Sequence, residues 1–164
     1  MIKIDYKPEV CHECGQTKDY ALAIDRGTIK ILKQMARFIG QKGINVVHPR
    51  KEMEGTLLTS NEVGNLSRPR IHGLIAKIKG EPGNYCLTSK GASFLHGHAI
   101  PRVAIRSKAT GHTTGYYLPD ENPERMCTIH DFGADEPWWH GINYDIEGGR
   151  IIKNEQPSQG IAGL

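Results

Sequence analysis

The chain has 164 residues, of which 38% are hydrophobic and 24% charged, and its formal net charge is +3. This length suffices for one well-buried core, or for one core that carries a small subdomain. There is no run of about 18 apolar residues, which a membrane span needs, and no signal-peptide pattern, so we expect a cytoplasmic protein that does not enter a membrane.

Charge is distributed unevenly along the sequence. Residues 67–119 contain eight Lys and Arg residues and one acid, Glu81, whereas residues 120–147 contain eight acids and one cation, Arg125. A basic segment of this kind suits a polyanion such as nucleic acid. The alternative is that the two segments form ion pairs with each other across the fold.

Two cysteines near the N-terminus are spaced as in a zinc knuckle. Cys11 and Cys14 are separated by two residues and followed by glycine, which lets the backbone fold under both thiolates. Cys127 and His130 repeat this spacing, so we expect a structural zinc ion held by all four residues and joining the two ends of the fold. The alternative is that the first pair is reduced on a loop and the second lies on a strand.

The strongest helical pattern runs from Asp25 to Gln41. Asp25 is a suitable N-cap, apolar residues recur every three or four positions, and Gly43 can end the helix in a left-handed conformation. Phe38 and Ile31 widen the apolar stripe beyond the needs of one small core. The helix 25–41 is therefore our candidate for a homodimer contact.

Two further helices are predicted after residue 57. Thr59 and Glu62 have the spacing of a capping box, which indicates a short helix. Ser67 then serves as the N-cap of a second helix with a proline near its start. The apolar face of this second helix comprises Ile71, Leu74, Ile75 and Ile78. In the interior of such a helix Gly73 would mark a close approach of two backbones.

The second helix is our candidate for nucleic-acid recognition. Its polar residues Arg68, Arg70, His72 and Lys77 cannot share the buried face, so we expect them to point outward and to contact a major groove. The start of the helix, at Ser67, is a further anion site. The remaining candidate contacts are the cations Lys79, Lys90, Arg102 and Arg106.

A turn over 81–84, a strand over 85–87 and a helix that begins after Thr88 complete this region. Beyond it, alternating residues predict a strand over 102–106 with a basic face, paired with a strand over 113–118.

One stretch matches a known signature. Its residues are Tyr85, Leu87, Thr88, Lys90, Gly91, Phe94 and Leu95. They fit the pattern Y-x-L-T-x-K-G-x-x-F-L, which closes many bacterial winged-helix regulators. Together with the Cys knuckle and a following G-x-x-I-P-x-V strand, the stretch resembles a group of small bacteriophage and mobile-element proteins over residues 10–106. The resemblance implies a winged helix-turn-helix, with a first helix shorter than usual, and it implies no reaction.

Two other functions remain open. The acidic region 118–164, with Trp138 and Trp139, is a candidate surface for a host protein, in which case the chain would be a protein-interaction module that does not contact DNA. A metal-dependent hydrolase is the second alternative. Its candidate ligands are His96, His98, His112 and either Asp131 or Asp135. A histidine at the end of a helix, such as His96, more often acts as a cap.

The sequence therefore predicts an α+β protein with a winged helix-turn-helix core and a β-rich, zinc-stapled subdomain formed by both termini. The expected parts are a knuckle segment (1–24), the winged helix (25–96), the β-rich subdomain (97–154) and a tail (155–164). The expected function is regulatory binding of double-stranded DNA.

Overall fold

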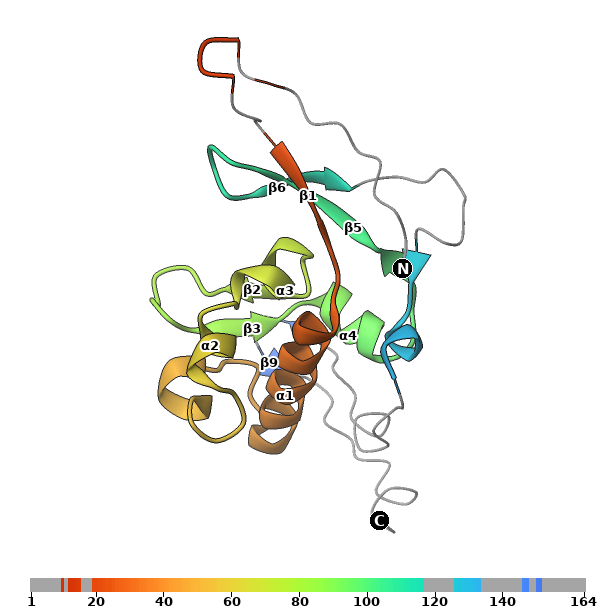
Figure 1. Ribbon diagram of the computed structural model, residues 1–164. Coiled ribbons are helices and arrows are strands. Elements are labelled where there is room, and N and C mark those ends of the chain that lie inside the picture. Colours follow the sequence, from red (N-terminus) through yellow and green to blue (C-terminus); the bar gives the residue numbers. More distant parts are fainter. Residues whose placement is uncertain are drawn as a thin grey trace.

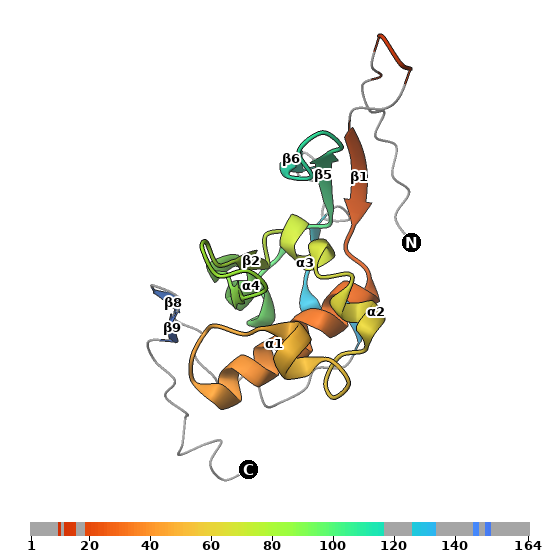
Figure 2. The same cartoon turned by 90° about the vertical axis from the view of Figure 1, so that its left-hand side faces the viewer.

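The computed structural model describes Val10, residues 12–15, 19–116 and 126–133, and the backbone of residues 146–147 and 150–151. Helices and antiparallel strands form one mixed α+β structure, which confirms the predicted class. A three-stranded sheet stands at one end of the helical part in both views (Figures 1 and 2). None of the helices in the described ranges has the length and apolar character that crossing a membrane requires.

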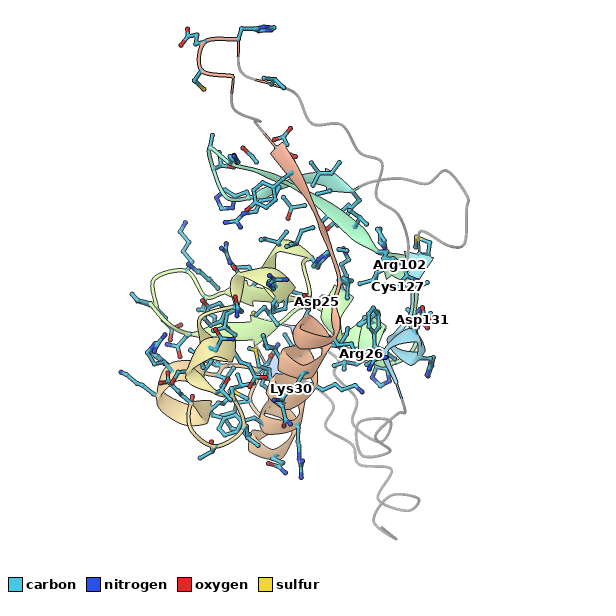
Figure 3. All side chains as sticks on the ribbon, in the orientation of Figure 1. Asp25, Arg26, Lys30, Arg102, Cys127 and Asp131 are labelled. Carbon is cyan, nitrogen blue, oxygen red and sulfur yellow. The ribbon has the colours of Figure 1, made fainter. Side chains whose placement is uncertain are left out.

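The longest helix is α1 (Arg26–Lys42), and its first turns carry Arg26 and Lys30 (Figure 3). The Asp25 side chain caps it by accepting a hydrogen bond from the Thr28 amide at 2.8 Å, and Gly43 ends it with a φ of 75°. Both predicted ends are confirmed. The side chains that α1 buries completely are Leu32, Met35, Ala36 and Ile39.

The wide apolar stripe of α1 is used within the chain. Ile31 is 2% exposed, and Phe38 is partly buried against the core. Neither side chain therefore presents a bare apolar surface for the homodimer contact predicted through this helix.

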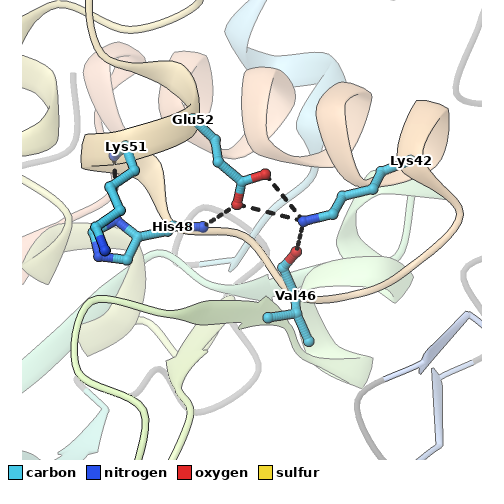
Figure 4. A network of polar contacts seen from close by, with 5 residues as sticks. All are labelled: Lys42, Val46, His48, Lys51 and Glu52. Atoms are coloured by element: carbon cyan, nitrogen blue, oxygen red, sulfur yellow. Dashed lines mark hydrogen bonds and ion pairs between the residues drawn. The ribbon is translucent and has the colours of Figure 1, made fainter.

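A polar network joins the end of α1 to the single-turn π-helix η1 (Pro49–Met53), as Figure 4 shows. The Lys42 ammonium donates to the Val46 carbonyl at 2.9 Å and to the Glu52 carboxylate at 3.0 Å, while the His48 amide donates to the same carboxylate at 2.8 Å. Burial raises the pKa of Glu52, but the His48 hydrogen bond and the Lys42 charge outweigh it and lower this pKa.

Two short helices follow, α2 (Ser60–Val63) and α3 (Ser67–Ile71). The predicted capping box of α2 is present: the Glu62 amide donates to Thr59 Oγ1 at 3.1 Å, and the Thr59 amide donates to Glu62 Oε1 at 2.9 Å. The expectation of a short first helix is thereby confirmed, because α2 has four residues.

The prediction for the second helix was wrong in length. Helix α3 has five residues and begins at Ser67, with Leu66 rather than Ser67 in the capping position. Its end is a Schellman motif, in which the Gly73 amide donates to the Arg70 carbonyl and the Leu74 amide to the Pro69 carbonyl. Gly73 has a φ of 75°, so it terminates the helix instead of marking a backbone approach inside it.

The residues assigned to the rest of that helix form a hairpin. Strand β2 (Ile75–Lys77) pairs antiparallel with β3 (Tyr85–Leu87), and the predicted turn over 81–84 connects them. Lys77 therefore lies on a strand and not on a helix, which corrects its predicted position.

A third segment completes this hairpin at its edge. Val47 and Tyr85 exchange two backbone hydrogen bonds of 2.9 and 2.8 Å. The buried side chain of Asn45 continues the pairing, because its Oδ1 accepts from the Leu87 amide and its Nδ2 donates to the Leu87 carbonyl, both at 2.7 Å. One amide side chain thus takes the place of a neighbouring strand.

Helix α4 (Ser89–Leu95) begins at the predicted cap, where Thr88 Oγ1 accepts from the Gly91 amide at 3.0 Å. Gly91 packs directly on the chain that leads into β2: a Cβ there would lie 2.2 Å from the Leu74 carbonyl oxygen. Only glycine at this position permits α4 to approach so closely.

The three-stranded sheet combines the N-terminal part of the chain with a segment after α4. Its strands are β1 (Asp19–Ala23), β5 (Val103–Ser107) and β6 (Thr113–Tyr116), with β5 in the middle. The predicted pairing of the two later strands is therefore confirmed, and β1 leads directly into α1 (Figure 1).

Smaller pairings join β4 (Ile100–Pro101) to β7 (Met126–Cys127), which the 3-10 helix η3 (Ile129–Phe132) follows, and β8 (Ile146–Glu147) to β9 (Arg150–Ile151). Ile100, Cys127 and Ile129 belong to the same buried cluster as α1 and α4. Within the described part of the chain, β4, β7 and η3 thus extend the hydrophobic core of α1 and α4.

Candidate nucleic-acid interface

An open cleft of about 500 Å³ separates α3 and β2 from the turn between β5 and β6. Its wall on the helical side comes from Arg70, Ile71, Gly73, the residues of β2 and Thr88. Its wall on the sheet side comes from Gly111, His112, Thr113 and Tyr116. Residues about 40 positions apart in the sequence meet here because the Thr113 hydroxyl donates to the Ile71 carbonyl.

The basic side chains that line the cleft are Arg70, Lys77 and His112, and none of its lining residues in the described ranges is an acid. Within the described ranges the side chains of Lys77 and His112 have no hydrogen bond or ion pair, and the buried Nε of Arg70 has no acceptor. Lys77 and His112 therefore need not give up a protein partner when an anion enters the cleft.

Lys90 supports the sheet side of the cleft from α4. Its ammonium donates to the Tyr116 hydroxyl at 2.9 Å and lies 4.1 Å from the centre of the Tyr116 ring. This contact is a combined hydrogen bond and cation–π interaction. Lys90, predicted to contact nucleic acid, therefore holds a cleft residue in place from inside the fold.

Arg68 is held by a different partner, Asp25. Its Nη1 lies 2.7 Å from Asp25 Oδ2, and the two side chains are 42% and 47% exposed. Burial raises the pKa of Asp25, but the hydrogen bonds from Thr28 and the Arg68 charge outweigh it and lower this pKa. The guanidinium thus neutralises the cap of α1 and contributes less charge to the surface than predicted.

The cations of the later strands also have partners. Arg102 donates to the Met126 carbonyl at 3.2 Å and lies 3.8 Å from Asp131, a contact between the basic and the acidic segment (Figure 3). Arg106 donates to the Gly111 carbonyl and packs over the Tyr20 ring at 5.5 Å. The alternative of pairing between the two segments is therefore realised at Arg102.

The prediction that His72 points outward is wrong. It follows the last residue of α3, is 1% exposed, and has no hydrogen-bond partner for either ring nitrogen within the described part of the chain. Burial, with a smaller effect from the Lys90 charge, lowers its pKa from 6.5 to about 4. A neutral imidazole inside the fold cannot contact phosphate.

The remaining predicted contacts, Ser67 and Lys79, do not line the cleft. Lys79 is exposed in the turn that joins β2 to β3, and Ser67 is partly buried at the start of α3. Of the nine predicted residues, Arg70 and Lys77 line the cleft, and Lys90 supports it.

The predicted zinc ligands are only partly described. Cys11 lies outside the described residues, and Cys14 is exposed in a turn that precedes β1 in the chain. Cys127 is buried in β7 (Figure 3). Burial raises the pKa of the Cys127 thiol to about 11. His130 is exposed in η3. Zinc stays a prediction, which elemental analysis of the purified protein and of a Cys11→Ser variant tests.

In the described ranges no three His, Cys, Asp or Glu side chains gather in a group that could hold a metal ion. His96 ends α4 as its C-cap, and His112 lines the basic cleft. Asp135, and with it Trp138 and Trp139 of the predicted protein-binding surface, lies outside the described residues.

Comparison of the chain with protein-family models, curated proteins and solved structures finds no match. The function therefore has to be inferred from the residues and their geometry alone.

Sequence reasoning missed two residues of the cleft. His112 was considered only as a metal ligand, and Tyr116 only as part of a strand. The signal for the end of α3 was present, because a glycine followed by leucine after a short apolar helix is the pattern of a Schellman motif. Nothing in the sequence indicated that the β5–β6 turn would lie against α3.

Proposed function

We propose that this chain is a nucleic-acid-binding protein whose cleft between α3–β2 and the β5–β6 turn contacts phosphate groups. The observation that carries the proposal is the set of three basic side chains, Arg70, Lys77 and His112, around an open cleft with no acid among its described lining residues. Most contacts between proteins and nucleic acids go to phosphate, and Arg and Lys supply much of the affinity.

The order of the elements supports the proposal. Helix α1, the Val47 edge, α2, α3 and the β2–β3 hairpin follow one another as in a winged helix-turn-helix. We therefore keep the winged helix as part of the proposal, and a regulatory role because of the regulator-like signature over 85–95. The five residues of α3 extend only about 7.5 Å, so our proposal does not include the reading of bases by a long recognition helix.

Fluorescence anisotropy with labelled oligonucleotides at increasing salt tests the proposal. We expect log affinity to fall linearly with log salt, by roughly 0.7–0.9 per phosphate contact. Arg70→Ala and Lys77→Ala should each weaken binding and reduce this slope.

The matched controls are Arg50→Ala and Lys51→Ala in η1, which lies outside the cleft. They should bind as the unchanged protein does. If neither single-stranded nor duplex oligonucleotides bind at low salt, the proposal is wrong.

A further inference from the structure

We infer that the cleft binds one strand of single-stranded nucleic acid, with phosphate against Arg70, Lys77 and His112 and a base against Tyr116. This inference rests on the proposed function and names the form of nucleic acid that the same cleft takes. It depends on the position of the β5–β6 turn, the volume of the cleft and the aromatic ring beside its cations.

The β5–β6 turn makes duplex binding through α3 unfavourable. A helix with its side chains is about 10–12 Å across, and the major groove is about 12 Å wide, so a helix alone fills the groove. Strand β6, which follows the turn, is attached to α3 by the bond from Thr113 to the Ile71 carbonyl and to α4 by the contact between Tyr116 and Lys90. A helix with this turn at its side is too broad to enter, whereas a single strand needs no groove.

The cleft has the size of a nucleotide unit. Its volume of about 500 Å³ is within the roughly 300–1,000 Å³ of sites for small ligands. A duplex is far too large for such a space, and one sugar, phosphate and base is not. The cleft is also open, so the unit that it holds can belong to a longer strand.

The composition of the cleft also fits a single strand. Proteins that bind single strands combine a basic groove, which follows the backbone, with aromatic side chains on which bases stack. Tyr116 lines the same cleft as Arg70 and Lys77. Lys90 holds its hydroxyl and contacts its ring, so the ring is ordered before a ligand arrives. Lys90 is therefore a positioning residue for this aromatic surface.

The test compares a labelled thymidine 20-mer with a labelled 20-base-pair duplex of mixed sequence, by anisotropy at equal salt. We expect the single strand to bind more tightly. Tyr116→Ala should weaken this binding about fivefold to 150-fold, because stacking on an aromatic side chain is worth about 1–3 kcal/mol per base. Tyr116→Phe keeps the ring but loses the hydroxyl that Lys90 holds, so it should lose much less binding than Tyr116→Ala.

Thermal unfolding of each variant shows whether it folds. If Tyr116→Ala does not fold, Tyr116→Phe is tested in its place. In that case the inference is supported if Lys77→Ala loses binding while Tyr116→Phe and Lys51→Ala keep most of theirs. It is overturned if Lys77→Ala binds as the unchanged protein does.

The outcomes separate this inference from the proposed function. A duplex that binds as tightly as the single strand, with the same loss in Arg70→Ala, overturns the single-strand inference and leaves the function intact. The single-strand inference is also overturned if neither Tyr116→Ala nor Lys77→Ala changes the affinity for the single strand. Thymidine 5′-monophosphate competing as well as the 20-mer would assign the cleft to a free nucleotide. Absence of binding to all three probes overturns inference and function together.

Discussion

His72 lies at the junction of α3, β1 and α4, where an outward-facing side chain was predicted. The helix ends one residue before it, so the turn that follows directs its ring into the fold. Its imidazole is near three charged groups, Asp25, Arg68 and Lys90. The burial of this ring outweighs the attraction of Asp25, and the residue stays neutral in the folded protein.

We predict that His72 makes the protein less stable in mild acid. Its pKa is about 4 when folded and 6.5 in its ordinary state, so between these values the unfolded chain binds a proton that the folded chain does not. The contribution of the neutral His72 to the free energy of unfolding is fully present above pH 6.5 and is lost as pH falls towards 4. The free energy of unfolding falls by at most about 1.4 kcal/mol per pH unit through this group. Urea unfolding across this range measures it.

His72→Leu is the control, since it removes the titrating group. The slope between pH 6.5 and pH 5 should disappear in this variant, whatever its absolute stability. The lowered pKa values of Asp25, Glu52 and Glu62 act at lower pH, because their ordinary values are 3.8, 4.5 and 4.5. An unchanged slope in His72→Leu would contradict the assignment.

Asn45 is the second residue whose side chain decides local structure. Asn45→Ala should lower the free energy of unfolding by roughly 2–6 kcal/mol, because it leaves the buried amide and carbonyl of Leu87 without partners, at about 1–3 kcal/mol each. Chemical denaturation measures this loss. Asn65→Ala is the matched control, since the Asn65 bond to the Asn61 carbonyl is at the surface, and it should cost much less. Equal losses in both variants would contradict this role.

At the scale of elements, the boundary between α3 and β2 shows the limit of periodicity. Ile71, Leu74 and Ile75 are all buried, as the helical pattern required, but they belong to a helix end, a turn and a strand. Apolar residues at these spacings suit one long helix as well as a short helix followed by a strand. The left-handed conformation of Gly73 decides between them.

Gly91 governs the contact between α4 and the chain before β2. We expect Gly91→Ala to destabilise the protein by roughly 1–3 kcal/mol, because its Cβ would lie 2.2 Å from the Leu74 carbonyl oxygen and 2.9 Å from Leu87 Cδ1. Thermal or urea unfolding checks this. The control is Gly27→Ala in α1, where the nearest atom is 3.6 Å away and alanine should maintain or raise stability. Equal stability of the two variants would refute the close approach.

At the scale of the whole molecule, a helical part with a deep core carries a sheet that is only partly buried. Leu32, Met35 and Ile39 of α1 have no exposed surface, whereas no residue of β6 is buried. Hydrogen bonds and an aromatic contact attach the sheet beside α3, and the cleft lies along this attachment. A cleft bordered by a less stable element can adjust to a ligand.

Amide hydrogen exchange should reveal this difference. We expect the buried amides of α1 to exchange at rates near those of global unfolding, and those of β6 to exchange faster through local opening. Addition of the single-stranded 20-mer should slow exchange in β6 and in the turn before it. Equal protection of α1 and β6 without nucleic acid would mean that the sheet opens only together with the core.

The sequence by itself determined the helix α1 with its caps, the capping box of α2, the Thr88 start of α4 and the pairing of β5 with β6. These features depend on residues that are near one another in the chain, so their side chains and spacing carry the information. Only the tertiary structure decided that α3 ends at Ile71, that His72 is buried, that Asn45 pairs with Leu87, and that the β5–β6 turn closes a basic cleft against α3. Those outcomes depend on contacts between distant residues, where packing overrides any local pattern.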